Sequence, residues 1–233
     1  MSLPYFFTEN LSAEDQLILP EETSKHCIQV LRMQEGEQMI LTDGKGKLLT
    51  VTILNADRKH CVVKINERGS EKQNKKKVTI AMSLLKNNSR FEWFLEKATE
   101  IGISEIIPLI CKRTEKQYFR LDRMQQIVVS AMLQSQQSWL PVLQEPTSFD
   151  KVIAGKNYTT NLIAHCEEDK KQEIADITIT NNTIILIGPE GDFTVDEIQL
   201  ALQNKYNSVS LGTTRLRTET AGVVAASLLK NIP

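Results

Sequence analysis

The spacing of apolar residues follows one rule in the first third of the chain and another in the remainder. Residues 38–42, 47–54 and 60–65 have the pattern of short strands, and Asp43-Gly44-Lys45-Gly46 between the first two is a turn signal. A short helix is predicted before them, over residues 23–31. A small, turn-rich and mostly β segment of this kind predicts a β-barrel.

In the remainder, apolar runs alternate with stretches whose apolar residues recur at helical spacing. Phe91, Phe94, Leu95 and Ala98 form one such stretch, and Gly102 follows where a helix C-terminal cap belongs. Strands that alternate with helices predict an α/β fold with a parallel sheet covered on both faces. We expect strands over residues 78–85, 103–110, 161–166, 183–187 and 208–211, and helices over residues 121–136 and 218–229.

Three helix starts carry capping signals. Ser89 with Glu92, and Thr194 with Glu197, have the spacing of a capping box, in which two side chains satisfy two backbone N–H groups reciprocally. Thr218 is placed to cap the last helix. These signals predict where the three helices begin.

A polar segment separates the two patterns. Residues 68–77 contain no apolar side chain and are the best candidate for a linker. The length of 233 residues allows one large domain or two ordinary ones. We therefore expect a small β domain over residues 1–72 and an α/β domain over residues 73–233.

Composition narrows the class of protein. Hydrophobic residues make up 41% and charged residues 24%, and no apolar run of about 18 residues predicts a membrane span. The N-terminus lacks the pattern of a secretory signal. The four cysteines form no C-x-x-C pair, and the three histidines complete no metal-ligand pattern. We expect a cytoplasmic protein with reduced thiols, no metal and no membrane partner.

The first candidate site is the turn Gly188-Pro189-Glu190-Gly191, which leaves an apolar strand. Its glycines would let a ligand approach the backbone, although an ordinary strand-to-helix connection explains the turn equally well. The turn lacks the ending of a P-loop and the three-glycine dinucleotide fingerprint, and Glu190 and Asp192 would repel a triphosphate. A positively charged ligand without a phosphate chain fits better.

The second candidate site, residues 211–221, follows the next apolar strand. Ligands of open α/β sheets bind where loops leave the carboxyl ends of strands, so the two loops could form two walls of one pocket. Thr218 as a helix cap and Glu219 near the positive helix end have structural explanations. Arg217 has none, because a cation is slightly unfavourable there. Arg217 is therefore a candidate functional residue.

A third feature is a basic stretch that either forms a solvated face or contacts phosphates. Lys86 and Arg90 lie at another loop where a substrate could bind. The net charge of −1 means that any RNA contact depends on such local patches. The stretch contains Lys112, Arg113, Lys116, Arg120 and Arg123.

These motifs resemble a known family, the bacterial uridine-N3 methyltransferases of small-subunit ribosomal RNA, which belong to the SPOUT class. The resemblance covers nearly the whole chain. In the second part it rests on Gly-Pro-Glu-Gly at 188–191, Leu211-Gly212 and Leu216-Arg217-Thr218-Glu219-Thr220-Ala221, with further matches at Lys86, residues 90–102, Pro108 and Arg113. In the first part His26, Val30-Leu31-Arg32, Gly36 and Asp43-Gly44 resemble the family's PUA-like RNA-binding barrel.

The resemblance implies a SPOUT-type parallel sheet with a C-terminal trefoil knot, a homodimer, and S-adenosyl-L-methionine as cofactor. The acceptor would be N3 of one uridine in 16S rRNA, presented as RNA or in the assembled small ribosomal subunit. The implied cofactor-binding residues are Ile187, Gly188, Pro189, Gly191, Leu211, Gly212, Leu216, Thr218 and Ala221. The implied RNA-binding residues are Arg32, Lys86, Arg90 and Arg113.

We expect Arg217 and Glu219 to be the catalytic residues. Uridine N3 must lose its proton before it can attack a methyl carbon, and a cation near O2 or O4 favours the resulting anion. Arg217 adjoins the implied cofactor loop and fits that role. Glu219 is a second candidate, as a base or as a stabiliser of the helix end.

The sequence departs from the family pattern at four positions. Leu133 and Gln137 stand where the family commonly has an acid and an arginine. Asp192 replaces a glycine, and Thr214 replaces an arginine. Two alternatives therefore stay open: a non-catalytic RNA-binding ribosome assembly factor that keeps the fold, and a nucleotide-binding enzyme of another α/β type.

Overall fold

The computed structural model describes residues 3–11, 14–155, 158–167 and 171–231. They form two compact units. The first unit runs to residue 73 and also contains residues 132–140, and the second contains residues 74–131 and those from 141 onward. Within the described ranges, no helix is long and apolar enough to cross a membrane.

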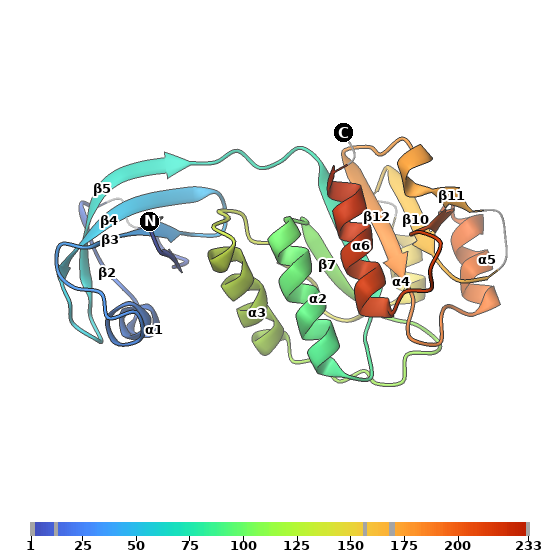
Figure 1. Ribbon diagram of the computed structural model, residues 1–233, viewed down its shortest axis with the longest axis horizontal. Helices are drawn as coiled ribbons and strands as arrows, with labels where there is room; N and C mark the ends of the chain where they lie inside the picture. Colours follow the sequence, from blue (N-terminus) through green and yellow to red (C-terminus); the bar gives the residue numbers. More distant parts are fainter. Residues whose placement is uncertain (1–2, 12–13, 156–157, 168–170, 232–233) are drawn as a thin grey trace. The chain divides into compact units, whose positions relative to one another are not determined.

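The first unit is built on a five-stranded sheet of order β1-β3-β4-β5-β2 (Figure 1). Strand β1 runs parallel to β3, and the other neighbours are antiparallel. Buried side chains such as Phe6, Met39 and Val51 form its core. The elements are β1 (Tyr5–Phe7), β2 (Gln16–Ile18), α1 (Glu21–Lys25), the π-helix η1 (His26–Val30), β3 (Gln38–Thr42), β4 (Lys47–Asn55) and β5 (Val62–Ser70).

Three features of this unit differ from the prediction. The helix expected over 23–31 is divided between α1 and η1. Strand β5 continues to Ser70, so part of the polar segment expected as a linker is paired with β4. Strands β1 and β2 were not predicted, because three residues are too few to show a period.

The second unit is built on an eight-stranded sheet of order β11-β13-β10-β12-β6-β7-β8, with β9 also paired to β7. Every pair is parallel, which confirms the predicted parallel sheet. The strands are β6 (Lys77–Ser83), β7 (Glu105–Ile110), β8 (Val142–Leu143), β9 (Thr147–Ser148), β10 (Thr160–Ala164), β11 (Gln172–Glu173), β12 (Asn182–Ile187) and β13 (Asn207–Ser210). The helices are α2 (Asn88–Ile101), α3 (Leu121–Gln134, whose last three residues belong to the first unit), α4 (Phe149–Ala154), the short 3-10 helix η2 (Ile174–Asp176), α5 (Val195–Gln203) and α6 (Thr218–Asn231).

Helices cover both faces of this sheet, as predicted. Helices α2 and α6 lie side by side over one face (Figure 1). A Cβ added at Gly222 of α6 would lie 2.7 Å from the Phe94 ring and 2.8 Å from Met82 Sδ, so only glycine permits this approach. On the other face, α4 and α5 contribute Phe149 and Ile198 to a cluster of buried strand residues.

Two of the capping predictions are wrong and one is confirmed. Asn87, not Ser89, caps α2, because the Asn87 side chain accepts a hydrogen bond from Ser89 N at 2.9 Å. Thr218 is the first residue of α6 and not the cap before it. The carbonyl of the preceding residue, Arg217, accepts a hydrogen bond from Ala221 N at 2.8 Å, so Arg217 occupies the capping position. The capping box of α5 is present as predicted, with both of its reciprocal hydrogen bonds.

Candidate functional site

The second unit contains a cavity of about 720 Å³ at the carboxyl ends of β10, β12 and β13. These strands are adjacent in the sheet, so the loops that leave them converge. The start of α6 and Arg90 of α2 complete the wall. The volume lies in the range of about 300–1,000 Å³ that is typical of small-molecule sites.

The loop after β12 is tightly folded around Asp192. Asp192 N donates a hydrogen bond to the Pro189 carbonyl at 2.9 Å, and the residue has a φ of 63°. Aspartate tolerates this left-handed conformation better than most residues, which explains how it can occupy a position where glycine is expected. Its carboxylate accepts hydrogen bonds from Phe193 N at 2.8 Å and from Cys166 N at 2.7 Å. Asp192 therefore ties this loop to the end of β10.

Arg113 braces the same loop from the segment after β7. Its Nη1 donates to the Gly191 carbonyl at 2.6 Å and to the Phe193 carbonyl at 3.2 Å. A Cβ added at Gly191 would lie 3.4 Å from Arg113 Cδ, so this glycine faces the arginine. On the other side, Lys86 N donates to Glu190 Oε1 at 3.2 Å. The glycine turn is thus held by two segments that are distant in sequence.

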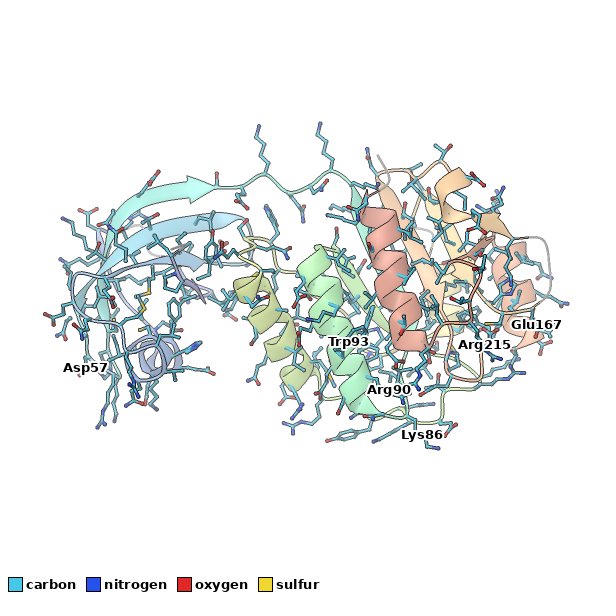
Figure 2. The ribbon with its side chains drawn as sticks, viewed as in Figure 1. Asp57, Lys86, Arg90, Trp93, Glu167 and Arg215 are labelled. Atoms are coloured by element: carbon cyan, nitrogen blue, oxygen red, sulfur yellow. The ribbon has the colours of Figure 1, made fainter. Side chains whose placement is uncertain are left out.

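The loop after β13 is more open. Gly212 has a φ of 127°, and a Cβ added there would meet no atom within 4 Å. Arg215 and Arg217 are exposed and line the cavity (Figure 2 labels Arg215). Arg217 makes no ion pair with any described residue. Its charge is therefore available to a ligand.

Glu219, in the first turn of α6, is the buried acid of the cavity wall. The residue is 7% exposed, and its Oε1 lies 3.6 Å from Arg90 Nε. Its Oε2 has no hydrogen-bond partner among the described residues. The cavity thus combines an available cation with a buried carboxylate, a pair that can stabilise an anion and accept a proton.

Three of the five cations of the basic stretch, and Lys86 outside it, pair with neighbouring acids. Hydrogen bonds to Glu115 and Asp196 raise the pKa of Lys86 and Lys112, respectively. These exposed pairs match a solvated face better than a free phosphate-binding surface. The pairs are Lys86–Glu115, Lys112–Asp196, Arg120–Asp122 and Arg123–Glu92.

The cavity brings together most of the residues that the sequence singled out. Ile187, Gly188, Pro189, Leu211, Gly212, Leu216, Thr218 and Ala221 line it, as do Arg90, Arg217 and Glu219. Gly191, Lys86 and Arg113 lie outside the lining, and Arg32 is an exposed residue of the first unit with a φ of 56°. Sequence reasoning missed the wall formed by the end of β10 and the segment after it, which consists of Ala164, His165, Cys166 and Lys171. The sequence could have predicted this wall, because β10 is also an apolar run and its carboxyl end lies between those of β12 and β13.

Two family profiles match the chain. The profile described as an RNA methyltransferase domain matches residues 71–230 and therefore covers the cavity and both loops. The chain belongs to the RNA methyltransferase family. A second profile, described as an RNA methyltransferase PUA domain, matches residues 19–66, which confirms the PUA-like first part of this methyltransferase.

Individual proteins that are similar to this methyltransferase agree with the family assignment. The ribosomal RNA small subunit methyltransferase E of Mesomycoplasma hyopneumoniae (strain 232) is 32% identical over 225 residues, which cover 94% of this chain and 96% of the relative. A crystal structure of a probable rRNA-methyltransferase from Porphyromonas gingivalis is 36% identical with a TM-score of 0.88, covering 96% of this chain and 95% of that one. The ribosomal RNA small subunit methyltransferase E from Neisseria gonorrhoeae, crystallised with S-adenosyl methionine, is 28% identical with a TM-score of 0.88. The match covers 97% of this chain and 96% of that one.

Arg113 braces the glycine turn of this methyltransferase, so its removal should weaken ligand binding at that turn. Arg113→Ala is expected to weaken the binding of S-adenosylmethionine by about tenfold, because a hydrogen bond to a charged group contributes about 1.5–3 kcal/mol and this one is partly exposed. Titration calorimetry measures the effect, and Lys116→Ala, an exposed cation of the same stretch, is the control. If RNA affinity falls while the affinity for the methyl donor is unchanged, Arg113 contacts RNA and does not brace the loop.

Proposed function

We propose that this methyltransferase transfers the methyl group of S-adenosylmethionine to N3 of a uridine in 16S rRNA, the RNA of the small ribosomal subunit. The observation that carries the proposal is the position of Arg217 and Glu219 on the wall of the cavity between the two glycine-containing loops. The profile match and the small-subunit methyltransferases among the relatives support the substrate class.

The residues of the cavity fit the methyl donor. Ile187, Leu211 and Leu216 offer apolar surface for an adenine ring, and the open backbone at Gly212 allows close approach. Glu190 suits a positively charged ligand, and the loops lack a phosphate cradle. When bound, S-adenosylmethionine supplies an electrophilic methyl group. The chain itself supplies orientation, which contributes up to roughly 7–11 kcal/mol in ideal cases.

The target uracil must leave its RNA helix or folded RNA before it can be methylated, because its N3 lies on the Watson–Crick edge. Arg217 would stabilise the uridine anion through O2 or O4. The PUA-like part with Arg32 would hold the surrounding RNA mainly through its shape and phosphates.

A homodimer, a C-terminal trefoil knot and a cytoplasmic location complete the proposal. Trp93 on α2 is 42% exposed and Leu228 on the neighbouring helix α6 is 38% exposed, which supports a partner over these helices. The knot is part of the proposal because the resemblance to the SPOUT class implies it. Light scattering of the purified protein would measure the oligomeric state.

Transfer of a labelled methyl group tests the central claim. The purified protein is incubated with labelled S-adenosylmethionine and either 16S rRNA or assembled small subunits, and methylated nucleosides are mapped by mass. We expect N3-methyluridine in at least one of the two substrates, and its absence from rRNA of cells that lack the protein.

Two outcomes would contradict the proposal. RNA binding without transfer would instead support the assembly factor. Binding of ATP or NAD in place of S-adenosylmethionine in calorimetry would support another kind of nucleotide-binding enzyme.

A further inference from the structure

The Glu219 carboxylate is the least satisfied charged group of the cavity. Its side chain is 10% exposed, and Oε2 is buried without a hydrogen-bond partner among the described residues. Leaving a buried acceptor unpaired costs about 1–3 kcal/mol, and more for a charged group. Such an atom on the wall of a ligand cavity indicates that a ligand supplies the missing donor.

Arg90 makes the two oxygens of this carboxylate unequal. Arg90 lies in the first turn of α2, where Figure 2 labels it, and its Nε is 3.6 Å from Glu219 Oε1. Oε1 therefore faces a cation, while Oε2 has no partner. The terminal torsion of glutamate is broad, so a small turn of the carboxylate presents Oε2 to a ligand while Arg90 still neutralises its charge.

The other acids of the cavity are already engaged. Both Asp192 oxygens accept backbone hydrogen bonds, and Glu190 Oε1 accepts one from Lys86 N. Among the described acids of the lining, Glu219 is thus the one with a buried oxygen that accepts no hydrogen bond. Because Arg90 already balances its charge, a neutral N–H suits Glu219 better than a second cation does.

We propose that Glu219 removes the proton from N3 of the target uracil and that Arg90 is the positioning residue that holds Glu219 for this step. The inference rests on the proposed function. The N3–H bond breaks, the proton moves to Glu219 Oε2, and the electron pair stays on N3. N3 then bonds to the methyl carbon as the electron pair of the S–C bond moves to sulfur. Arg217 stabilises the anion formed between these events.

Glu219→Gln tests the base, because the amide keeps the size of the side chain and cannot take the proton. We expect methylation at neutral pH to fall about 10²–10⁴-fold, the usual contribution of general base catalysis. The affinity for S-adenosylmethionine, measured by calorimetry, should stay within about threefold. The rate of the variant should rise about tenfold per pH unit as the uracil ionises in solution, whereas the rate of the wild type stays flat over the same interval.

The pH profile also separates this carboxylate from the charged groups around it. Arg90 of α2, Arg217 before α6, Glu190 after β12, and His165 and Lys171 after β10 share the cavity. Glu190→Gln is the matched control, and it should keep the shape of the wild-type profile. A fall in donor affinity equal to the fall in rate would show that Glu219 binds the donor's ammonium group and would overturn the proposal. An unaltered profile for Glu219→Gln would do the same.

Arg90 is tested by Arg90→Gln and Arg90→Lys. Arg90→Gln should lower kcat about tenfold with little change in the KM for RNA, and Arg90→Lys, which keeps the charge, should recover most of that loss. Adding Arg90→Gln to Glu219→Gln should cause no further loss, because the two residues act as one unit. A raised KM with unchanged kcat would assign Arg90 to RNA phosphates instead.

Thermal unfolding checks that each variant folds. The wild-type protein is measured alongside the variants in every assay. If the wild type forms no N3-methyluridine, both the proposed function and this inference fail. If the wild type forms it and Glu219→Gln forms it equally fast, only the inference fails.

Discussion

Replacement of Arg217 by alanine is expected to lower turnover about 10²–10³-fold, equivalent to about 2.7–4 kcal/mol, while the affinity for S-adenosylmethionine changes little. The guanidinium lines the cavity ahead of α6 and has no ion-pair partner among the described residues, so its charge can meet the charge that develops on uracil. This charge exists only during the reaction, so the loss should appear in kcat. Single-turnover methylation and calorimetry measure the two quantities separately.

Two matched variants control for net charge. Arg215→Ala removes a cation from the same loop and should cost much less than Arg217→Ala. Arg217→Lys keeps a positive charge but loses the planar fork, so its activity should lie between that of the wild type and Arg217→Ala. Equal losses of turnover and donor affinity in Arg217→Ala would mean that Arg217 binds the donor and does not stabilise the anion.

Replacement of Phe193 by alanine is expected to lower the free energy of unfolding by about 3–5 kcal/mol. The Phe193 side chain is fully buried, and its ring centre lies 5.4 Å from that of Phe149. The residue also supports the glycine turn, because its backbone N and ring lie 3.1 Å from where a Cβ of Gly188 would be. Donor affinity should therefore fall together with stability, as measured by urea unfolding and calorimetry.

Tyr118→Ala is the matched control for the loss of an aromatic ring, because Tyr118 is 60% exposed. It should change the free energy of unfolding by no more than about 0.5 kcal/mol. If Phe193→Ala loses less than about 1 kcal/mol, the ring does not hold the turn against the sheet.

Local chemistry explains which elements could be predicted from the sequence. The capping box of Thr194 and Glu197 needs only residues three apart, and both of its hydrogen bonds are present. The central strands β6, β7 and β12 are almost entirely buried, so their sequences are continuous apolar runs. The convergence of the loops after β12 and β13 on one cavity followed from the predicted parallel sheet.

The parts that were missed depend on contacts between distant residues. Arg113 and Gly191 are 78 positions apart, and nothing in either segment reveals their hydrogen bond. The return of residues 132–140 to the first unit depends on such contacts too, including a bridge between Lys45 and Trp139. Asn87 and Ser89 are both good caps by composition, so the sequence alone does not decide between them.

The hydrogen bond from Cys166 N to Asp192 has a consequence for ligand binding. One carboxylate joins the ends of β10 and β12, so neither strand end can shift without stretching that bond. A molecule that docks against the turn after β12 therefore also restricts the backbone at Cys166. By thermodynamic linkage, if binding at the turn raises the affinity of a second ligand for the Cys166 segment, that second ligand raises the affinity at the turn by the same factor.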